Sequence, residues 1–167
     1  MVKKDRSQCY ERGYQTMNMN IETIQSCSIA YIRQIGVYGE ENIQTMEQLK
    51  HWAKTNNLMN SKAVIFGIAH DNPQTTSPEN CRYDACILLA DEHFPAGANV
   101  QHGEIAGGKY SVFTVKHTAE AVERAWVEIF PVFSESGYLP DTTRPILERY
   151  AAEKLEQHLC EICVPIC

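Results

Sequence analysis

The sequence predicts an α+β fold made of two tandem strand-helix-strand-strand modules, with pseudo-two-fold symmetry and a ligand cleft between them. Two observations predict it. The same order of an opening extended segment, an amphipathic helix and two further strands occurs twice along the 167 residues. A small sheet with one helix also leaves an apolar face open, so two such modules would pack together and create a cleft at their junction.

The first module is expected at about residues 27–90. It opens with AYIRQIGVYG, and the helix ENIQTMEQLKHWAKTNNL follows because Ile43, Met46 and Ala53 recur at helical spacing. The pair Asn56-Asn57 suits the end of that helix. Two strands, AVIFGIAHD and RYDACILL, complete the module, and the turn-rich DNPQTTSPEN connects them.

The second module is expected at residues 109–167, after a linker at 91–108. YSVFTVKHTA is its opening strand, and Thr118 is a suitable N-cap for the helix AEAVERAWVEIFPVFSESGYL, which Gly137 ends. Pro131 is expected to kink or shorten the last turns of that helix. The strands RPILERYAAE and LCEICVPI follow. The buried stripe of the helix comprises Val122, Ala125, Trp126, Ile129 and Phe133.

Composition and charge narrow the class of protein. The net charge is −6, from 15 basic and 21 acidic residues, which argues against direct nucleic-acid binding over a broad surface. No apolar run is long enough to cross a membrane, and the start MVKKDRSQCYERG lacks the apolar core of a secretory signal. We therefore expect a cytoplasmic protein with a polar N-terminal extension at residues 1–25.

The seven cysteines raise the question of a metal site. Cys160 and Cys163 form the most suggestive pair, but they lie in LCEICVPI, which has the pattern of a strand. Residues three apart in a strand point to opposite faces, so the two thiols would not bind one ion. We expect no metal site and no cofactor.

Glu148 is an unusual residue for the strand RPILERY. Alternation of side chains places it on one face with Ile146 and Tyr150. Two interpretations stay open: a solvated sheet edge where Arg149 or another base pairs with the carboxylate, or an enclosed site. In the alignment of the two modules Gly67 corresponds to Glu148, and this contrast of small and large polar residues would leave a void for a guest molecule.

An enclosed carboxylate needs a partner, because an isolated buried charge is very costly. A cation would fill that role, and aromatic walls would add roughly 0.5–2 kcal/mol to its binding. The aromatic candidates are Tyr150, Trp126 and Phe113. Trp126 also fits the buried stripe of its helix, so a purely structural role for it remains an alternative.

Three stretches together resemble the GyrI-like family, the effector-binding domain of AraC-type regulators: GIAHDNPQTTSPENCRYDACILL, GGKYSVFTVKHTAEAVERAW, and RPILERY followed by CEICVPI. The resemblance implies a GyrI-like domain at residues 26–167. It also implies binding of hydrophobic, drug-like or toxin-like cations, with Glu148 as the partner of the charge. The expected ligand-binding residues are Glu148, Tyr150, Trp126, Phe113, Ile146 and Gly67.

The resemblance leaves the activity open between three functions. The first is a stand-alone binding protein for amphipathic cations. The second is a hydrolase that opens cyclopropyl groups of DNA-alkylating toxins, with Glu148 and Tyr150 as its catalytic groups. The third is an interaction protein whose partner is gyrase or a transcription factor. Residues 1–25 show no two-helix pattern typical of a DNA-binding region, so we expect a sensor that does not itself contact DNA.

Overall fold

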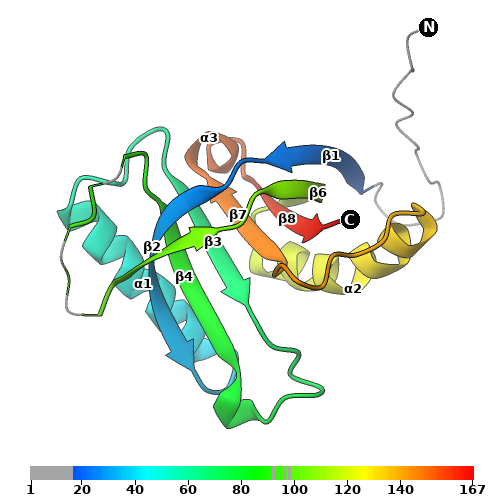
Figure 1. Cartoon of the computed structure of the whole chain (residues 1–167), viewed down its shortest axis with the longest axis horizontal. Helices are drawn as coiled ribbons and strands as arrows, with labels where there is room; N and C mark the ends of the chain where they lie inside the picture. Colours follow the sequence, from blue (N-terminus) through cyan, green and yellow to red (C-terminus); the bar gives the residue numbers. More distant parts are fainter. Residues whose placement is uncertain (1–16, 92, 96, 98) are drawn as a thin grey trace, which may run out of the picture.

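The computed structural model describes residues 17–91, 93–95, 97 and 99–167, which form an eight-stranded antiparallel sheet with helices packed on it (Figure 1). The strands are β1 (Asn18–Ile24), β2 (Cys27–Ile35), β3 (Val64–Ala69), β4 (Arg82–Leu88), β5 (Gln101–Ile105), β6 (Gly108–Lys116), β7 (Leu147–Ala151) and β8 (Leu159–Pro165). The helices are α1 (Glu40–Thr55), α2 (Ala119–Glu135) and the short α3 (Ala152–Leu155), with one 3-10 turn, Pro78–Asn80. The predicted α+β class is confirmed.

The sheet order is β1-β6-β8-β7-β3-β4-β2-β5. Each half contributes three adjacent strands in the same pairing pattern, β2-β4-β3 and β6-β8-β7, and β3 pairs with β7 to join the halves. The predicted order of strand, helix, strand and strand is therefore present twice. A two-fold axis and a cleft between the halves stay predictions.

The two outer strands each pair with the other half of the molecule. β1 precedes the first half but pairs with β6, and β5 precedes the second half but pairs with β2. β1 falls within the segment expected to be a polar extension, residues 1–25, and β5 falls within the expected linker, 91–108. Both are edge strands whose side chains are mostly exposed, so neither carries the apolar pattern that identifies a buried strand.

The ends of the helices follow local chemistry. Gly39, with φ of 140°, allows the turn into α1, and Asn57, with φ of 57°, follows its end as the sequence predicts. Thr118 caps α2, because its hydroxyl accepts a hydrogen bond of 3.1 Å from the backbone N–H of Ala121.

Pro131 does not shorten α2, so that part of the prediction is wrong. The helix continues to Glu135 with Pro131 inside it. A proline removes the hydrogen bond to the carbonyl four residues earlier, here that of Val127. Both residues lie on the exposed side of the helix, where water reaches the carbonyl.

Three apolar clusters hold the sheet and the helices together. One lies under α1 and includes Leu49 and Ile65, and a second lies under α2 and includes Ile129. Tyr150 packs against both, so both helices lie on one face of the sheet. The third cluster takes residues of both halves on the opposite face.

Cys160 belongs to the cluster under α2, and Cys163 belongs to the cluster on the other face of the sheet. The predicted strand and the opposite orientation of the two thiols are therefore confirmed. A search of the described helices for one long and apolar enough to cross a membrane finds none.

Candidate functional site

The carboxylate of Glu148 lies at the seam between the two halves. Glu148 is on β7, directly opposite Gly67 of β3. Its Oε1 accepts a hydrogen bond of 2.6 Å from Nε1 of Trp126, and its Oε2 accepts one of 2.6 Å from the hydroxyl of Tyr150. Two neutral donors, one from α2 and one from the same strand, thus orient the carboxylate without neutralising it.

Arg149 does not pair with Glu148, so that version of the solvated-edge interpretation is wrong. Its Nε donates to Glu161 at 2.7 Å, and its two terminal nitrogens donate to Glu22 of β1 at 2.8 and 2.9 Å. Successive strand residues point to opposite faces, which directs Arg149 away from the helices. Within the described part of the chain, no basic side chain forms an ion pair with Glu148.

Gly67 lets two polar side chains lie close to the backbone of β3. A Cβ at this position would lie 3.3 Å from Oε2 of Glu148 and 2.9 Å from the hydroxyl of Tyr83. Tyr83 is on β4, half-buried, and its ring packs against the cluster under α1. The glycine therefore allows a phenol from the first half to approach a carboxylate from the second half.

Groups near the Glu148 carboxylate have raised pKa values. Burial, and then the charge of Glu148, raise the pKa of Tyr150 and of Tyr83 above the usual tyrosine range. The same two causes raise the pKa of the Cys160 thiol to about 11. Both phenols therefore keep their protons at neutral pH and act as hydrogen-bond donors.

The structure brings together four of the six predicted ligand-binding residues: Glu148, Tyr150, Trp126 and Gly67. Ile146 is partly buried and packs against the cluster under α2. Phe113 is fully buried in that same cluster, with 0% of its surface exposed, so it presents no surface to a ligand here.

Tyr83 was not predicted from the sequence. It lies in the stretch RYDACILL, but its proximity to Gly67 depends on the register that pairs Ala69 with Tyr83 and Gly67 with Ala85. Alternation along β4 alone shows only that Tyr83 shares a face with Ala85. The missing information was the register between β3 and β4.

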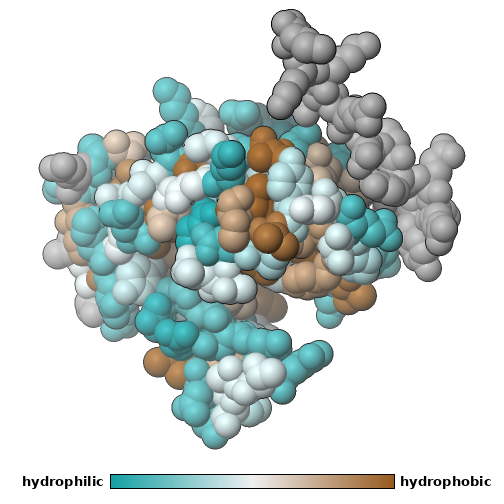
Figure 2. Space-filling model, turned by 45° about the vertical axis from the view of Figure 1, so that its right-hand side comes forward, coloured by the Kyte–Doolittle hydropathy of each residue, from teal (hydrophilic) through white to brown (hydrophobic). Residues whose placement is uncertain are grey.

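Aromatic side chains extend the site toward the surface. Phe130 lies 6.4 Å from Trp126 between ring centroids and is 47% exposed, and the ring of the exposed His117 lies 5.5 Å from that of Tyr150. Figure 2 turns the half that carries α2 forward and shows apolar groups gathered between hydrophilic ones. Next to the carboxylate, aromatic rings therefore adjoin polar hydrogen-bond donors.

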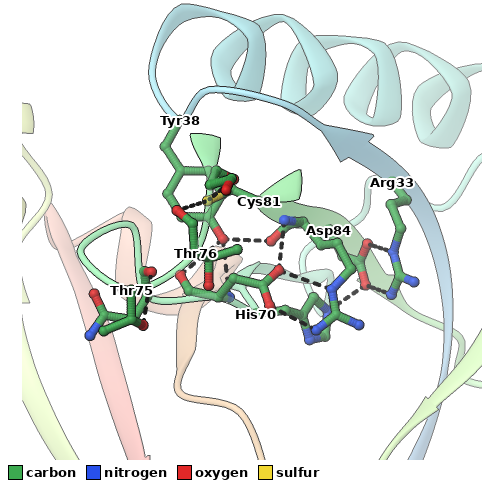
Figure 3. A network of polar contacts seen from close by, with 11 residues as sticks. Arg33, Tyr38, His70, Thr75, Thr76, Cys81 and Asp84 are labelled. Atoms are coloured by element: carbon green, nitrogen blue, oxygen red, sulfur yellow. Dashed lines mark hydrogen bonds and ion pairs between the residues drawn. The ribbon is translucent and has the colours of Figure 1, made fainter. Parts of the chain in front are cut away.

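A second polar cluster lies around Asp84 of β4 (Figure 3). Arg33 donates two hydrogen bonds of 2.8 Å to its carboxylate, and Nε2 of His70 lies 2.7 Å from Oδ2. Asp71 pairs with Arg82 nearby. Each carboxylate here has a guanidinium partner, so this cluster stabilises the loop between β3 and β4 and offers no free charge.

A surface hollow of about 640 Å³ lies on the side of α1 near residues 99–101. It is distinct from the Glu148 site, because none of Glu148, Trp126, Tyr150, Gly67 or Tyr83 lines it. Its lining is mostly polar: Ile32, Arg33, Gln34, Glu41, Gln44, Thr45, Gln48, Asn99, Val100 and Gln101. A search of the described residues for three or more His, Cys, Asp or Glu side chains grouped to hold a metal finds none.

One family model and several known sequences match most of the chain. The model of the GyrI-like small molecule binding domain matches residues 17–166, which begins just ahead of β1. The SPbeta prophage-derived protein YosT of Bacillus subtilis, named as a proposed transcriptional regulator, is 41% identical over 90% of this chain and 99% of its own length. A DNA gyrase inhibitor of Edwardsiella ictaluri is 24% identical over 90% of this chain and 98% of its own length.

Solved structures share the fold. The C-terminal domain of EcmrR superposes with a TM-score of 0.69 at 17% identity, covering 90% of this chain and 98% of that domain. SAV2435, solved with tetraphenylphosphonium bound, superposes with a TM-score of 0.56 at 13% identity, covering 90% of this chain and 94% of that chain.

Proposed function

Since this chain belongs to the GyrI-like small-molecule-binding domain family, we propose that it binds amphipathic cationic small molecules and that Glu148 holds their charge. The observation that carries the proposal is the carboxylate held by two neutral donors, Trp126 and Tyr150, with no basic partner in the described structure. The protein then acts as a receptor or a sequestering protein for drug-like or toxin-like cations.

A cation is favoured beside Glu148 for an electrostatic reason. Trp126 and Tyr150 fix the position of the charge but leave it uncompensated, so a cation that enters gains attraction without displacing a protein base. The indole, the phenols and Phe130 supply faces and edges suited to an aromatic or alkylated cation. SAV2435, with the same fold, was solved with such a cation, tetraphenylphosphonium.

The test compares a cation with a neutral molecule of similar shape. Methyltriphenylphosphonium and triphenylphosphine oxide are titrated by calorimetry into the native protein and into Glu148→Gln. We expect micromolar binding of the phosphonium, near −8 kcal/mol. The substitution should weaken phosphonium binding by about tenfold or more, roughly 1.4 kcal/mol, and leave the oxide unchanged.

Glu123→Gln provides a matched control, because it makes the same change in net charge on the exposed side of α2. Equal affinities of Glu148→Gln and the native protein for the phosphonium would exclude charge recognition by this carboxylate. Circular dichroism of each variant shows whether the fold is retained.

A second candidate function is hydrolysis of a strained cyclopropyl electrophile. The hydrogen bond from Tyr150 to Glu148 favours it, because a protonated phenol beside a carboxylate can serve as acid and base. In such a reaction water adds its oxygen to one ring carbon and a proton goes to the other. Incubation of a cyclopropyl-indole compound with catalytic amounts of protein distinguishes the functions: more than one product per site supports hydrolysis, and a single equivalent excludes it.

Interaction with gyrase or with a transcription factor is a third candidate, and it rests on the names of the relatives alone. No contact in the described structure favours it over small-molecule binding.

A further inference from the structure

The hydroxyl of Tyr83 and the carboxylate of Glu148 both lie close to Gly67. The position of a Cβ on Gly67 is 2.9 Å from the hydroxyl and 3.3 Å from Oε2 of Glu148. The ring of Tyr83 comes from β4 in the first half, whereas Glu148 comes from β7 in the second half. The two oxygens are therefore no more than 6.2 Å apart, and a ligand that contacts the carboxylate comes within reach of the phenol.

The hydroxyl of Tyr83 differs from the other donors near the carboxylate. Trp126 and Tyr150 each donate to Glu148. Among the residues that the structure describes, Tyr83 donates to none, and its hydroxyl is not among the buried atoms that lack a partner. It therefore reaches solvent with its proton unused, and burial and the Glu148 charge keep that proton bound by raising the pKa of Tyr83.

We propose that Tyr83 determines specificity at this site, and that the ligand class is a lipophilic cation that also carries a hydrogen-bond acceptor, such as a carbonyl oxygen, close to its charged body. This inference rests on the proposed function, in which Glu148 holds the positive charge. The acceptor then takes the proton of Tyr83. A cation with only hydrocarbon groups around its charge leaves this donor facing an apolar surface, and that is unfavourable.

Gly67 is the residue that makes the arrangement accessible. The first carbon of any side chain at position 67 would press against the phenol and the carboxylate, so at least one of them would have to move. Its backbone does not have a positive φ, so the space, and not the backbone conformation, is what a glycine provides here.

The test uses two cations of equal charge and similar shape. (4-Acetylphenyl)triphenylphosphonium carries a carbonyl acceptor, and (4-isopropylphenyl)triphenylphosphonium replaces it with a hydrocarbon group. A second pair carries the same two groups at the 3-position of the phenyl ring, which points the acceptor in another direction. Dissociation constants are measured for the native protein and for Tyr83→Phe. The measured quantity is the ratio of the two affinities, which cancels the general effect of the substitution on binding.

We expect Tyr83→Phe to shift this ratio away from the acetyl compound by about 3- to 10-fold in at least one pair, the loss of one neutral hydrogen bond. Tyr138→Phe, which removes an exposed hydroxyl from the turn after α2, should leave the ratio unchanged. Since the Tyr83 hydroxyl makes no hydrogen bond within the described protein, Tyr83→Phe should unfold at the same temperature as the native chain.

A ratio that changes by less than about twofold in both pairs overturns the proposal. That outcome differs from failure of the proposed function, which would appear as equal affinity of Glu148→Gln and native protein for the phosphonium ions. The Tyr83→Phe experiment compares two cations of equal charge, whereas the Glu148→Gln experiment compares a charged and a neutral side chain at position 148.

Discussion

The indole of Trp126 and the carboxylate of Glu148 are 22 residues apart in the chain and form a hydrogen bond of 2.6 Å. This contact connects the helix α2 to the strand at the centre of the sheet. Trp126 packs against the cluster under α2 and also contacts the carboxylate, so it has a structural role, and its role in ligand binding stays a proposal. A ligand that displaces the carboxylate would therefore change the surroundings of this indole.

The Trp126–Glu148 contact should be measurable as a coupling energy. Because the acceptor is charged and half-buried, we expect a double-mutant cycle of Trp126→Phe and Glu148→Gln to give a coupling of about 1–2 kcal/mol in the free energy of unfolding. Urea unfolding followed by circular dichroism provides the four values. Additive effects of the two substitutions would contradict the contact.

Gly67→Ala should reduce ligand binding without destabilising the fold. Its methyl group would meet the far end of the Tyr83 side chain at 2.9 Å, and that side chain can move aside. We expect the unfolding free energy to change by no more than about 1 kcal/mol, and phosphonium affinity to fall at least about fivefold because the methyl group displaces the phenol and crowds the carboxylate. Calorimetric titration measures the second quantity.

Gly103→Ala is the matched control for Gly67→Ala. Gly103 also lies in a strand, β5, and its Cβ would meet a tyrosine ring, that of Tyr31, at 2.8 Å. It lies on the edge strand, three positions from β3 in the sheet and away from Glu148, so it should leave phosphonium affinity unchanged. Equal losses of affinity in the two variants would show that the effect is not specific to the site.

Arg149 should be important for stability. It pairs with Glu161, whose side chain is 7% exposed, and with the more exposed Glu22. Arg149→Met leaves the buried Glu161 charge without its partner, so we expect a loss of about 3–5 kcal/mol in unfolding free energy. The double variant with Glu161→Gln should recover part of this loss, and Glu22→Gln alone should cost less than about 1 kcal/mol.

Acid should weaken the Asp71–Arg82 contact. Hydrogen bonds from the Arg82 side chain and backbone lower the pKa of Asp71 from 3.8 to about 2. Because the folded value is depressed, the stabilisation is present above the unfolded pKa and is lost as pH falls toward 2. The difference in unfolding free energy between the native protein and Asp71→Asn should therefore shrink as pH falls from about 6 to about 2. A difference independent of pH would count against the ion pair.

Local patterns predicted the secondary structure of both halves. Helical spacing predicted α1 and α2, and the Thr118 cap and the left-handed Asn57 are where the sequence placed them. The short helix α3 after β7 was missed, because four residues are too few for a periodic pattern. The outer strands β1 and β5 were missed because their side chains are mostly exposed.

Part of the candidate site was also predictable. Alternation along RPILERY places Glu148 and Tyr150 on one face, and the internal alignment matched Gly67 with Glu148, which the structure pairs directly. The expectation that Phe113 would line the site could not be checked from the sequence, because aromatic residues of a core and of a ligand site have the same pattern.

The sequence by itself determined the order of helices and strands and the face on which Glu148 lies, because periodicity and capping depend on residues close together in the chain. Only the tertiary structure decided which groups meet there. Trp126 reaches Glu148, Tyr83 approaches Gly67, and Arg149 turns to Glu22 and Glu161. These contacts depend on helix packing and on the register between strands far apart in sequence, and register is set by how whole faces of the sheet are buried.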